Sequence, residues 1–287
     1  MRPRTDSRIT LFFLTALTLA FVSASPARSE ETGDSRPGLY FTPHKLNYFI
    51  LNGLPPNDNA QVKFQISAKY QVVEWSDYHF YFAYTQKSFW NIGKPSMPFE
   101  ENNYNPEIFI SRTFDRPIRG NLELHDVAVG PIEHESNGLD GPDSRSWNRT
   151  YVASSLGLEP RKPLAETPAL IRYRFLFSIK LWVPYDTGSE DKYLESIGKG
   201  NERFTDYAGW GEVRINLRDL LWPKNQLDIT TRILNDWNKG GYEFGFHQNI
   251  PNTDFYLYAQ YWYGYGESLL RFAESDRRFK VGFSFFF

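Results

Sequence analysis

Residues 61–70 read Gln-Val-Lys-Phe-Gln-Ile-Ser-Ala-Lys-Tyr, so apolar and polar side chains alternate strictly. Because side chains of a β-strand point to opposite faces with a period of two, this stretch predicts a strand with one dry and one wet face. The dry face would carry Val62, Phe64, Ile66, Ala68 and Tyr70. A tilted strand that crosses a membrane needs about nine to eleven residues, and this run has that length.

The same alternation recurs along the chain and predicts twelve strands. They lie near residues 45–52, 61–72, 78–90, 106–115, 119–136, 146–158, 168–184, 205–218, 225–235, 240–249, 253–264 and 278–287. An even strand number is typical of closed bacterial barrels. The sequence therefore predicts an all-β fold, a twelve-stranded antiparallel transmembrane β-barrel over residues 30–287, with residues 30–44 as a loose or plugging N-terminal segment.

Composition narrows the classes of function. The 287 residues include 34 acidic and 32 basic side chains, and this balance disfavours nucleic-acid binding. The absence of cysteine excludes disulfides, thiolate nucleophiles and cysteine-held metal centres. Aromatic residues make up 17% although the mean hydropathy is −0.52, as expected when large rings alternate with polar residues.

The N-terminus resembles an export signal. Arg2, Arg4 and Arg8 precede an apolar stretch over residues 11–22, and Ala27-Arg28-Ser29 offers a small-residue cleavage site. Twelve apolar residues are too few for a helix that spans a membrane core of about 30 Å. Residues 1–29 are therefore predicted to be a cleaved signal peptide.

A soluble secreted β-sandwich is the alternative fold, in which the dry strand faces would pack against each other. Two features favour the barrel. The last strand ends on the aromatic residue Phe287, as outer-membrane barrels commonly do. Rings near predicted strand ends are expected to form an aromatic girdle: Trp75, Tyr78, Trp90, Trp182, Trp210, Trp222, Trp237 and Trp262.

Candidate catalytic residues lie at the end of one predicted strand. His134 and Ser136 share a strand face, about 6.6 Å apart along the strand, so a base and a nucleophile can meet. Counting back by twos gives Ile132, Gly130, Ala128, Asp126, Leu124 and Leu122, a mostly apolar series that should face lipid. Polar groups against hydrocarbon are costly and tend to be functional.

A polar hairpin follows and returns to Asn148, which antiparallel pairing should bring beside His134. An asparagine carbonyl can fix the histidine tautomer that deprotonates Ser136, and so the three roles of a hydrolytic triad are filled. The stretch lacks the first glycine of the nucleophile elbow and a following helix, which excludes the α/β-hydrolase interpretation.

These residues resemble the bacterial outer-membrane phospholipase A family. The matching stretch is His-Glu-Ser-Asn-Gly at 134–138, followed by Asp-Ser-Arg-Ser-Trp-Asn-Arg at 143–149, and further pieces match at Val62–Gln65, Tyr84–Ser88 and Gly264–Leu269. The resemblance implies an ester hydrolase that acts at the sn-1 and sn-2 positions of phospholipids and on lysophospholipids in the bacterial outer membrane. It assigns Ser136 as nucleophile, His134 as general base and acid, and Asn148 as the residue that orients His134.

The resemblance also implies a Ca²⁺ cofactor near the oxyanion. The backbone N–H of Gly138 would stabilise the oxyanion, and the metal ligands would be the carbonyl of Leu139, the hydroxyl of Ser144 and the carbonyl of Ser96 from a partner subunit. The acidic hairpin residues Asp140 and Asp143 are better explained as solvated turn residues than as direct ligands. This chain has Gly141 where the family uses an aspartate for a second calcium site.

Members of the family act as homodimers, and Gln86 bears on this independently. Its phase follows Tyr78, Phe80, Phe82 and Tyr84 on the predicted lipid face, where an amide would lack partners unless two copies bonded across a twofold axis. The alternative is a local change of phase caused by a β-bulge. For the whole chain, the alternative function is a non-enzymatic outer-membrane porin or structural barrel.

Overall fold

The computed structural model describes residues 41–54, 57–160, 173–185, 204–234 and 236–285. The predicted signal peptide, residues 30–40 and the terminal Phe287 lie outside the described residues. Within them the strands are β1 (Phe41–Pro43), β2 (Asn47–Leu51), β3 (Val62–Trp75), β4 (Tyr78–Trp90), β5 (Phe99–Arg119), β6 (Leu122–Ser136), β7 (Ser146–Pro160), β8 (Tyr173–Tyr185), β9 (Gly211–Arg218), β10 (Asn225–Ile233), β11 (Gly241–Asn249), β12 (Phe255–Gly264) and β13 (Asp276–Phe285). The helices are α4 (Phe204–Ala208) and the 3₁₀ turns η1 (Gly141–Asp143) and η2 (Trp237–Lys239).

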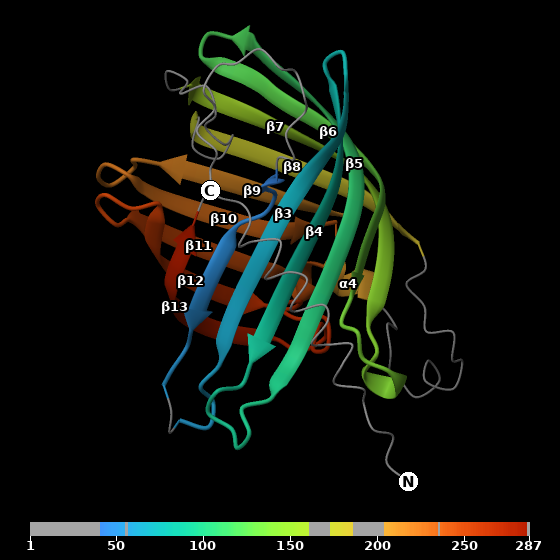
Figure 1. Cartoon of the computed structure of the whole chain (residues 1–287), viewed down its shortest axis with the longest axis vertical. Helices are drawn as coiled ribbons and strands as arrows, with labels where there is room; N and C mark the ends of the chain where they lie inside the picture. The colour runs from blue at the N-terminus through green and yellow to red at the C-terminus, as the bar shows by residue number, and fades with distance from the viewer. Residues whose placement is uncertain (1–40, 55–56, 161–172, 186–203, 235, 286–287) are drawn as a thin grey trace, which may run out of the picture. The chain divides into compact units, whose positions relative to one another are not determined.

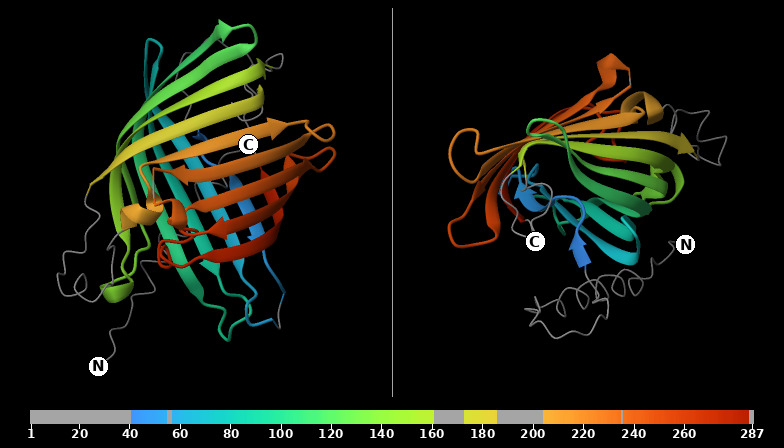
Figure 2. Two further views of the ribbon diagram at one scale, coloured as in Figure 1. Left: turned by 180° about the vertical axis from the view of Figure 1, so that it is seen from behind. Right: turned by 90° about the horizontal axis from the view of Figure 1, so that it is seen from above.

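The strands close into one antiparallel barrel (Figures 1 and 2). β1 and β2 pair with successive segments of β3, at Tyr70–Ala68 and Gln65–Val62, and so form a single interrupted strand. β2 also pairs with β13, and β3 pairs with β4, which leaves the strand order without a free edge. The twelve-stranded closed barrel predicted from alternation is confirmed.

Polarity is inverted relative to a water-soluble protein. Many large apolar side chains point outward and are exposed, among them Phe49, Phe82, Ile108, Val152, Leu257 and Phe283. Many buried side chains are instead polar or charged, among them Lys63, Glu107, Glu133, Arg149, His247 and Lys280. Because the dry faces do not pack against each other, the soluble sandwich is wrong. An apolar outer band around a polar interior is the arrangement of a transmembrane barrel.

Three local expectations are wrong or incomplete. The segment predicted as one strand over 205–218 begins with α4, and strand β9 starts only at Gly211. β5 starts at Phe99 rather than near 106, because its polar residues face the interior instead of forming a loop. Trp182 and Trp262 are buried inside the barrel, whereas Trp75, Trp210 and Trp222 are exposed at strand ends as a girdle requires.

The two barrel ends differ. At one end the described connections are short: residues 76–77, 120–121, 219–224 and 250–254. At the other end they are longer: residues 91–98, 137–145 and 265–275. Here an aromatic cluster packs inside the wall, with Trp147, Trp182, Phe204 and Phe272 as members. In the described part of the chain, no helix is long and apolar enough to cross a membrane.

Candidate active site

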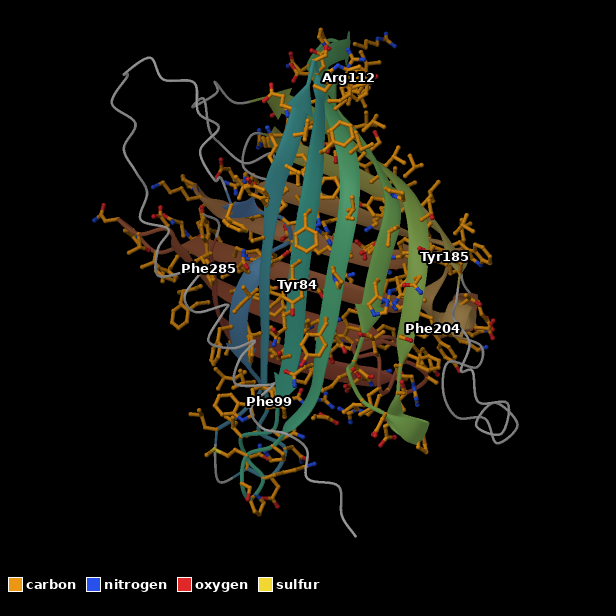
Figure 3. All side chains as sticks on the ribbon, turned by 45° about the vertical axis from the view of Figure 1, so that its right-hand side comes forward. Tyr84, Phe99, Arg112, Tyr185, Phe204 and Phe285 are labelled. Atoms are coloured by element: carbon orange, nitrogen blue, oxygen red, sulfur yellow. The ribbon has the colours of Figure 1, made fainter. Side chains whose placement is uncertain are left out.

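His134 and Asn148 meet across two neighbouring strands. The β6–β7 ladder pairs them directly, and His134 Nδ1 lies 2.8 Å from Asn148 Oδ1. Because an amide oxygen can only accept a hydrogen bond, Nδ1 donates, and Nε2 is left as a proton acceptor. Figure 3 shows the side chains on the barrel wall, with Tyr84 of β4 and Tyr185 of β8 among those labelled; β6 and β7 lie between these two strands in the ladder.

Ser136 is the last residue of β6 and shares the outward face with His134. Its ladder neighbours are Tyr104 on β5 and Ser146 on β7. Among the described residues, no hydrogen bond joins the Ser136 hydroxyl to His134. Hydrogen bonds between catalytic groups are often long before substrate binds, so the shared face, rather than a formed bond, relates these two residues.

Counting back by twos from His134 predicts a series of outward-facing residues on β6, and this prediction is wrong for Ala128 and Asp126. β6 is irregular between Gly130 and Glu133 and again between Leu124 and Asp126. Each bulge inserts an extra residue and shifts the phase. As a result Ala128 belongs to the buried interior cluster and Asp126 is half-buried, while Val129 and Ile132 are the exposed residues.

The hairpin after Ser136 is built around the buried side chain of Asn137. Its Oδ1 accepts from the backbone N–H groups of Leu139 and Arg145, and its Nδ2 donates to the carbonyl of Asp143, 2.8 Å away. Gly138 adopts φ +65, and a Cβ there would lie 2.8 Å from the ring of Tyr104. Only glycine fits this position without a shift. Burial lowers the pKa of Arg145 in this hairpin.

The oxygens proposed for metal binding sit in the same hairpin. Within the described residues, the Leu139 carbonyl and the Ser144 hydroxyl accept no hydrogen bond. Ser96 lies in the β4–β5 connection at the same barrel end, with φ +63. No group of three or more His, Asp or Glu side chains gathers as a metal site anywhere in the described ranges. A cation bound by the Leu139 carbonyl and the Ser144 hydroxyl would thus have two neutral oxygen ligands from this hairpin.

Behind the outward site lies an interior ion network that periodicity cannot reveal. Arg149 donates to both carboxylate oxygens of Glu133 at 2.5 Å, and Lys180 Nζ donates to Glu133 Oε2 at 2.6 Å. A bidentate pair of this kind holds both partners in a fixed geometry. Glu133 and Arg149 are the chain neighbours of His134 and Asn148, so the network fixes the two strands that carry the outward pair.

Gln86 faces outward without any change of phase. β4 keeps one register against β5 from Tyr78 to Phe89, so the bulge alternative is wrong at this position. The expectation that its amide lacks partners is also wrong: Oε1 lies 3.4 Å from the Tyr84 hydroxyl and Nε2 lies 3.2 Å from Ser88 Oγ. In the ladder, Gln86 pairs with Tyr104, which pairs with Ser136.

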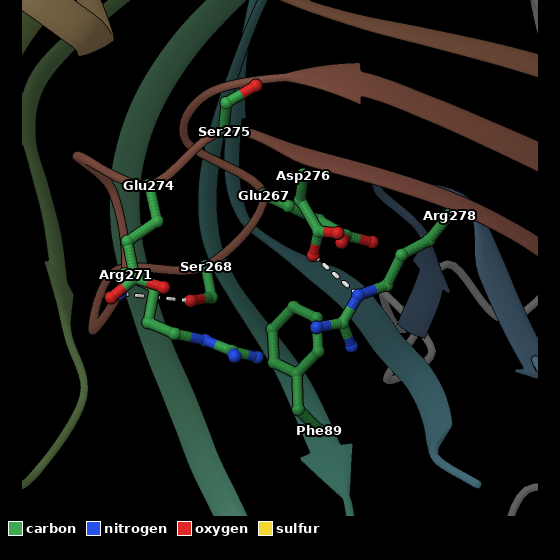
Figure 4. Close-up of a pocket in the computed structure, with 8 residues that line it drawn as sticks. All are labelled: Phe89, Glu267, Ser268, Arg271, Glu274, Ser275, Asp276 and Arg278. Carbon is green, nitrogen blue, oxygen red and sulfur yellow. Dashed lines mark hydrogen bonds and ion pairs between the residues drawn. The ribbon is translucent and has the colours of Figure 1, made fainter. Parts of the chain in front are cut away.

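A pocket of about 100 Å³ opens inside the barrel mouth, not at the outward pair (Figure 4). Its lining includes Phe89, Glu267 and Arg278. Glu267, from the β12–β13 connection, is held by Lys63 Nζ at 3.2 Å and Lys280 Nζ at 2.6 Å. Burial alone would raise the pKa of Glu267, but the two ammonium groups outweigh burial and lower it to about 2. An ion cluster that joins the β12–β13 connection to β3 and β13 thus lies at this pocket.

Comparison with known proteins shows the family of this chain. The family model described as Phospholipase A1 matches residues 44–285. A curated Phospholipase A1 of Salmonella typhimurium is 33% identical over 205 residues, which cover 70% of this chain and 60% of that relative. This chain therefore spans somewhat less than two thirds of the relative's length.

Solved structures of outer membrane phospholipases are also similar to this chain. The Salmonella typhi outer membrane phospholipase dimer with bound calcium is 27% identical, with a TM-score of 0.68 over 89% of this chain and 94% of that one. An active-site mutant of Escherichia coli outer membrane phospholipase A, in which alanine replaces asparagine, is 26% identical with the same TM-score and coverage. From its sequence and its fold, this chain belongs to the outer-membrane phospholipase A family.

Proposed function

We propose that the protein is a calcium-dependent phospholipase that hydrolyses acyl esters of phospholipids and lysophospholipids in the outer membrane. The hydrogen bond between His134 and Asn148, on an outward apolar face shared with Ser136, is the observation that carries the proposal. The active barrel would comprise residues 30–287 after removal of the signal peptide.

In the proposed reaction the Ser136 hydroxyl attacks the ester carbonyl carbon while His134 Nε2 takes the serine proton. The same nitrogen then gives this proton to the departing alcohol oxygen as the C–O bond breaks and an acyl-serine forms. Water, deprotonated by His134, releases the fatty acid and restores the serine. Asn148 keeps Nδ1 protonated throughout, so that Nε2 remains the acceptor.

Gly138 would stabilise the oxyanion. Among the described residues, its N–H donates to no other group, and its positive φ turns the chain just after the nucleophile. A donor already in place where negative charge develops contributes on the order of 10²–10³ to turnover in other hydrolases. A side chain at this position would meet the Tyr104 ring, so we expect only glycine to fit there without a shift.

The hairpin oxygens suit calcium. Ca²⁺ prefers six to eight oxygen ligands, and carbonyl, hydroxyl and water oxygens all serve. The unengaged Leu139 carbonyl and Ser144 hydroxyl would bind it, together with the Ser96 carbonyl of a second copy and water. When bound, the cation supplies positive charge close to the oxyanion. The related dimer with bound calcium supports this assignment.

A homodimer would place the site at the boundary between two barrels. Gln86 and Ser136 lie in one outward row, separated only by Tyr104, which is a span of about 10 Å over two strand spacings. Two copies that join through Gln86 would thus cover one side of the site with the partner's wall. Acyl chains would lie in the apolar space between them.

The long connections indicate the leaflet. In bacterial outer-membrane barrels the short turns face the periplasm and the long loops face outside. The hairpin at 137–145 is at the long-loop end. The proposed site is therefore at the level of the outer leaflet.

The test is fatty-acid release by the purified protein from phospholipid in detergent micelles with calcium. We expect release that depends on calcium. The absence of release over a wide range of detergent-to-protein ratios would contradict the phospholipase proposal. Steady ion conductance in a planar bilayer without any hydrolysis would instead favour the porin alternative.

A further inference from the structure

β5 has a proline opposite the proposed catalytic base. The ladder pairs Tyr104 with Ser136 and Glu107 with Glu133, so the same register places Pro106 across from His134. The two pairs in between do not appear as ladder partners, because proline has no N–H to donate. The His134 carbonyl thus lacks the backbone donor that β5 would ordinarily supply at this position.

The side chain of Asn105 takes the place of the missing donor. Its Nδ2 donates to the His134 carbonyl at 2.6 Å from inside the barrel, where Asn105 is 5% exposed. Its Oδ1 accepts from Lys45 Nζ at 2.5 Å, which fixes the amide with the nitrogen toward His134. Lys45 is itself held by Glu107 at 3.0 Å and by Glu133 at 3.3 Å.

We infer that Asn105 is a positioning residue for His134, acting through the main chain as a substitute for the N–H that Pro106 lacks. The inference rests on the proposed role of His134 as the base. β6 is already irregular between Gly130 and Glu133, just before the histidine. Without the Asn105 contact, only the flanking pairs at Tyr104 and Glu107 would hold this end of β6 against β5, so the main chain at His134 could move by a fraction of an ångström to about 1 Å. A shift of about 1 Å between reacting groups costs on the order of a hundredfold in rate.

The test removes the donor and then restores it elsewhere. Asn105→Leu keeps the shape of the side chain but cannot donate, and we expect kcat on a soluble short-chain ester to fall about ten- to a hundredfold with KM within about twofold. Adding Pro106→Ala to this variant supplies a backbone N–H at the vacant ladder position. The double variant should recover most of the lost kcat, which a merely space-filling role of Asn105 does not predict.

Asn103→Leu is the matched control. Asn103 is also an asparagine buried on the inner face of β5, and its side-chain atoms make no hydrogen bond in the described residues. It should retain near wild-type kcat. Heat resistance of each barrel in detergent shows that the variants are folded.

Unchanged kcat in a folded Asn105→Leu variant would overturn the inference, as would a double variant no more active than the single one. Hydrogen exchange of the new backbone amide at position 106 in the double variant gives a readout that does not depend on activity. We expect this amide to be protected, and free exchange would also overturn the inference. If the wild type released no acid, the proposed function would fail, yet the exchange measurement would still test the contact.

Discussion

Glu133 and His134 are adjacent in the chain but belong to opposite sides of the barrel wall. Glu133 is fully buried in the interior and bound by Arg149 and Lys180, whereas His134 faces outward and donates to Asn148. The alternation of a single strand thus couples a rigid charged interior to a base on the apolar surface. The interior pairs hold the strands, and the outward pair is positioned by them.

Replacing Asn148 tests the orientation of the base. Asn148→Ala removes the acceptor of His134 Nδ1–H, and we expect kcat on phospholipid to fall about ten- to a hundredfold, less than the loss in His134→Ala. Asn148→Asp keeps an acceptor and should retain more activity than the alanine variant. Equal activities of wild type and Asn148→Ala would remove this residue from the mechanism.

Calcium should act on turnover and not on folding. The closed strands satisfy their own backbone groups without a metal, so chelation should lower kcat at least about a hundredfold while heat resistance changes little. Ser144→Ala should raise the calcium concentration that gives half activity. Calcium titration of both proteins on a short-chain ester checks this. Superimposable curves would exclude Ser144 as a ligand, and full activity in excess chelator would exclude the metal from the mechanism.

Gln86 should stabilise the association of two barrels into a dimer. Two amide–amide hydrogen bonds across a twofold axis, at about 0.5–1.5 kcal/mol each, predict that Gln86→Ala weakens the dimer roughly tenfold. Sedimentation in detergent with calcium measures this. Thr231→Ala, on β10 six strands away around the barrel, serves as the control. Because the Gln86 amide already bonds to Tyr84 and Ser88, unchanged association would mean that these local bonds are its only role.

The ion cluster at the barrel mouth predicts a pH dependence of stability. The pKa of Glu267 is about 2, below its ordinary value of 4.5, so its contribution is present above about pH 4.5 and is lost as the pH falls toward 2. At pH 7, Glu267→Gln leaves the charges of Lys63 and Lys280 unpaired and should destabilise the barrel by about 3–5 kcal/mol. Urea unfolding in detergent at pH 7 and near pH 2 checks this. The difference in the free energy of unfolding between wild type and Glu267→Gln should be smaller near pH 2. Equal unfolding midpoints at pH 7 would contradict the account.

The alternation of apolar and polar residues predicted the barrel, but it assigned the inward and outward faces of only some strands correctly. The run from Gln61 to Tyr70 carries no irregularity, so counting by twos assigns both of its faces correctly. In β6 the same count fails before Glu133, because bulges insert residues that no alternation rule marks. The pairing of His134 with Asn148 could be predicted since their strands are consecutive and a single hairpin, residues 137–145, joins them.

Interior contacts could not be predicted from local pattern. Lys45 and Glu133 are 88 residues apart, and Lys63 and Glu267 are 204 apart, so they meet only once the barrel has closed. The Asn105 side chain supplies the N–H donor that Pro106 lacks. Recognising this role requires the register of β5 against β6 as well as the sequence. The helix α4 was missed because its five residues are too few for a helical period to appear.

The central claim is that Ser136 is the nucleophile of a phospholipase, and the most direct measurement compares three proteins on one phospholipid. Wild type, Ser136→Ala and the control Ser154→Ala are purified in detergent with calcium, and released fatty acid is followed over time. Ser154 is a serine hydroxyl on β7 that donates to the Asp126 carbonyl, away from His134. We expect release by wild type and by Ser154→Ala, and a loss of about 10⁴-fold or more in a folded Ser136→Ala barrel. Near wild-type release by the Ser136→Ala variant would contradict the account.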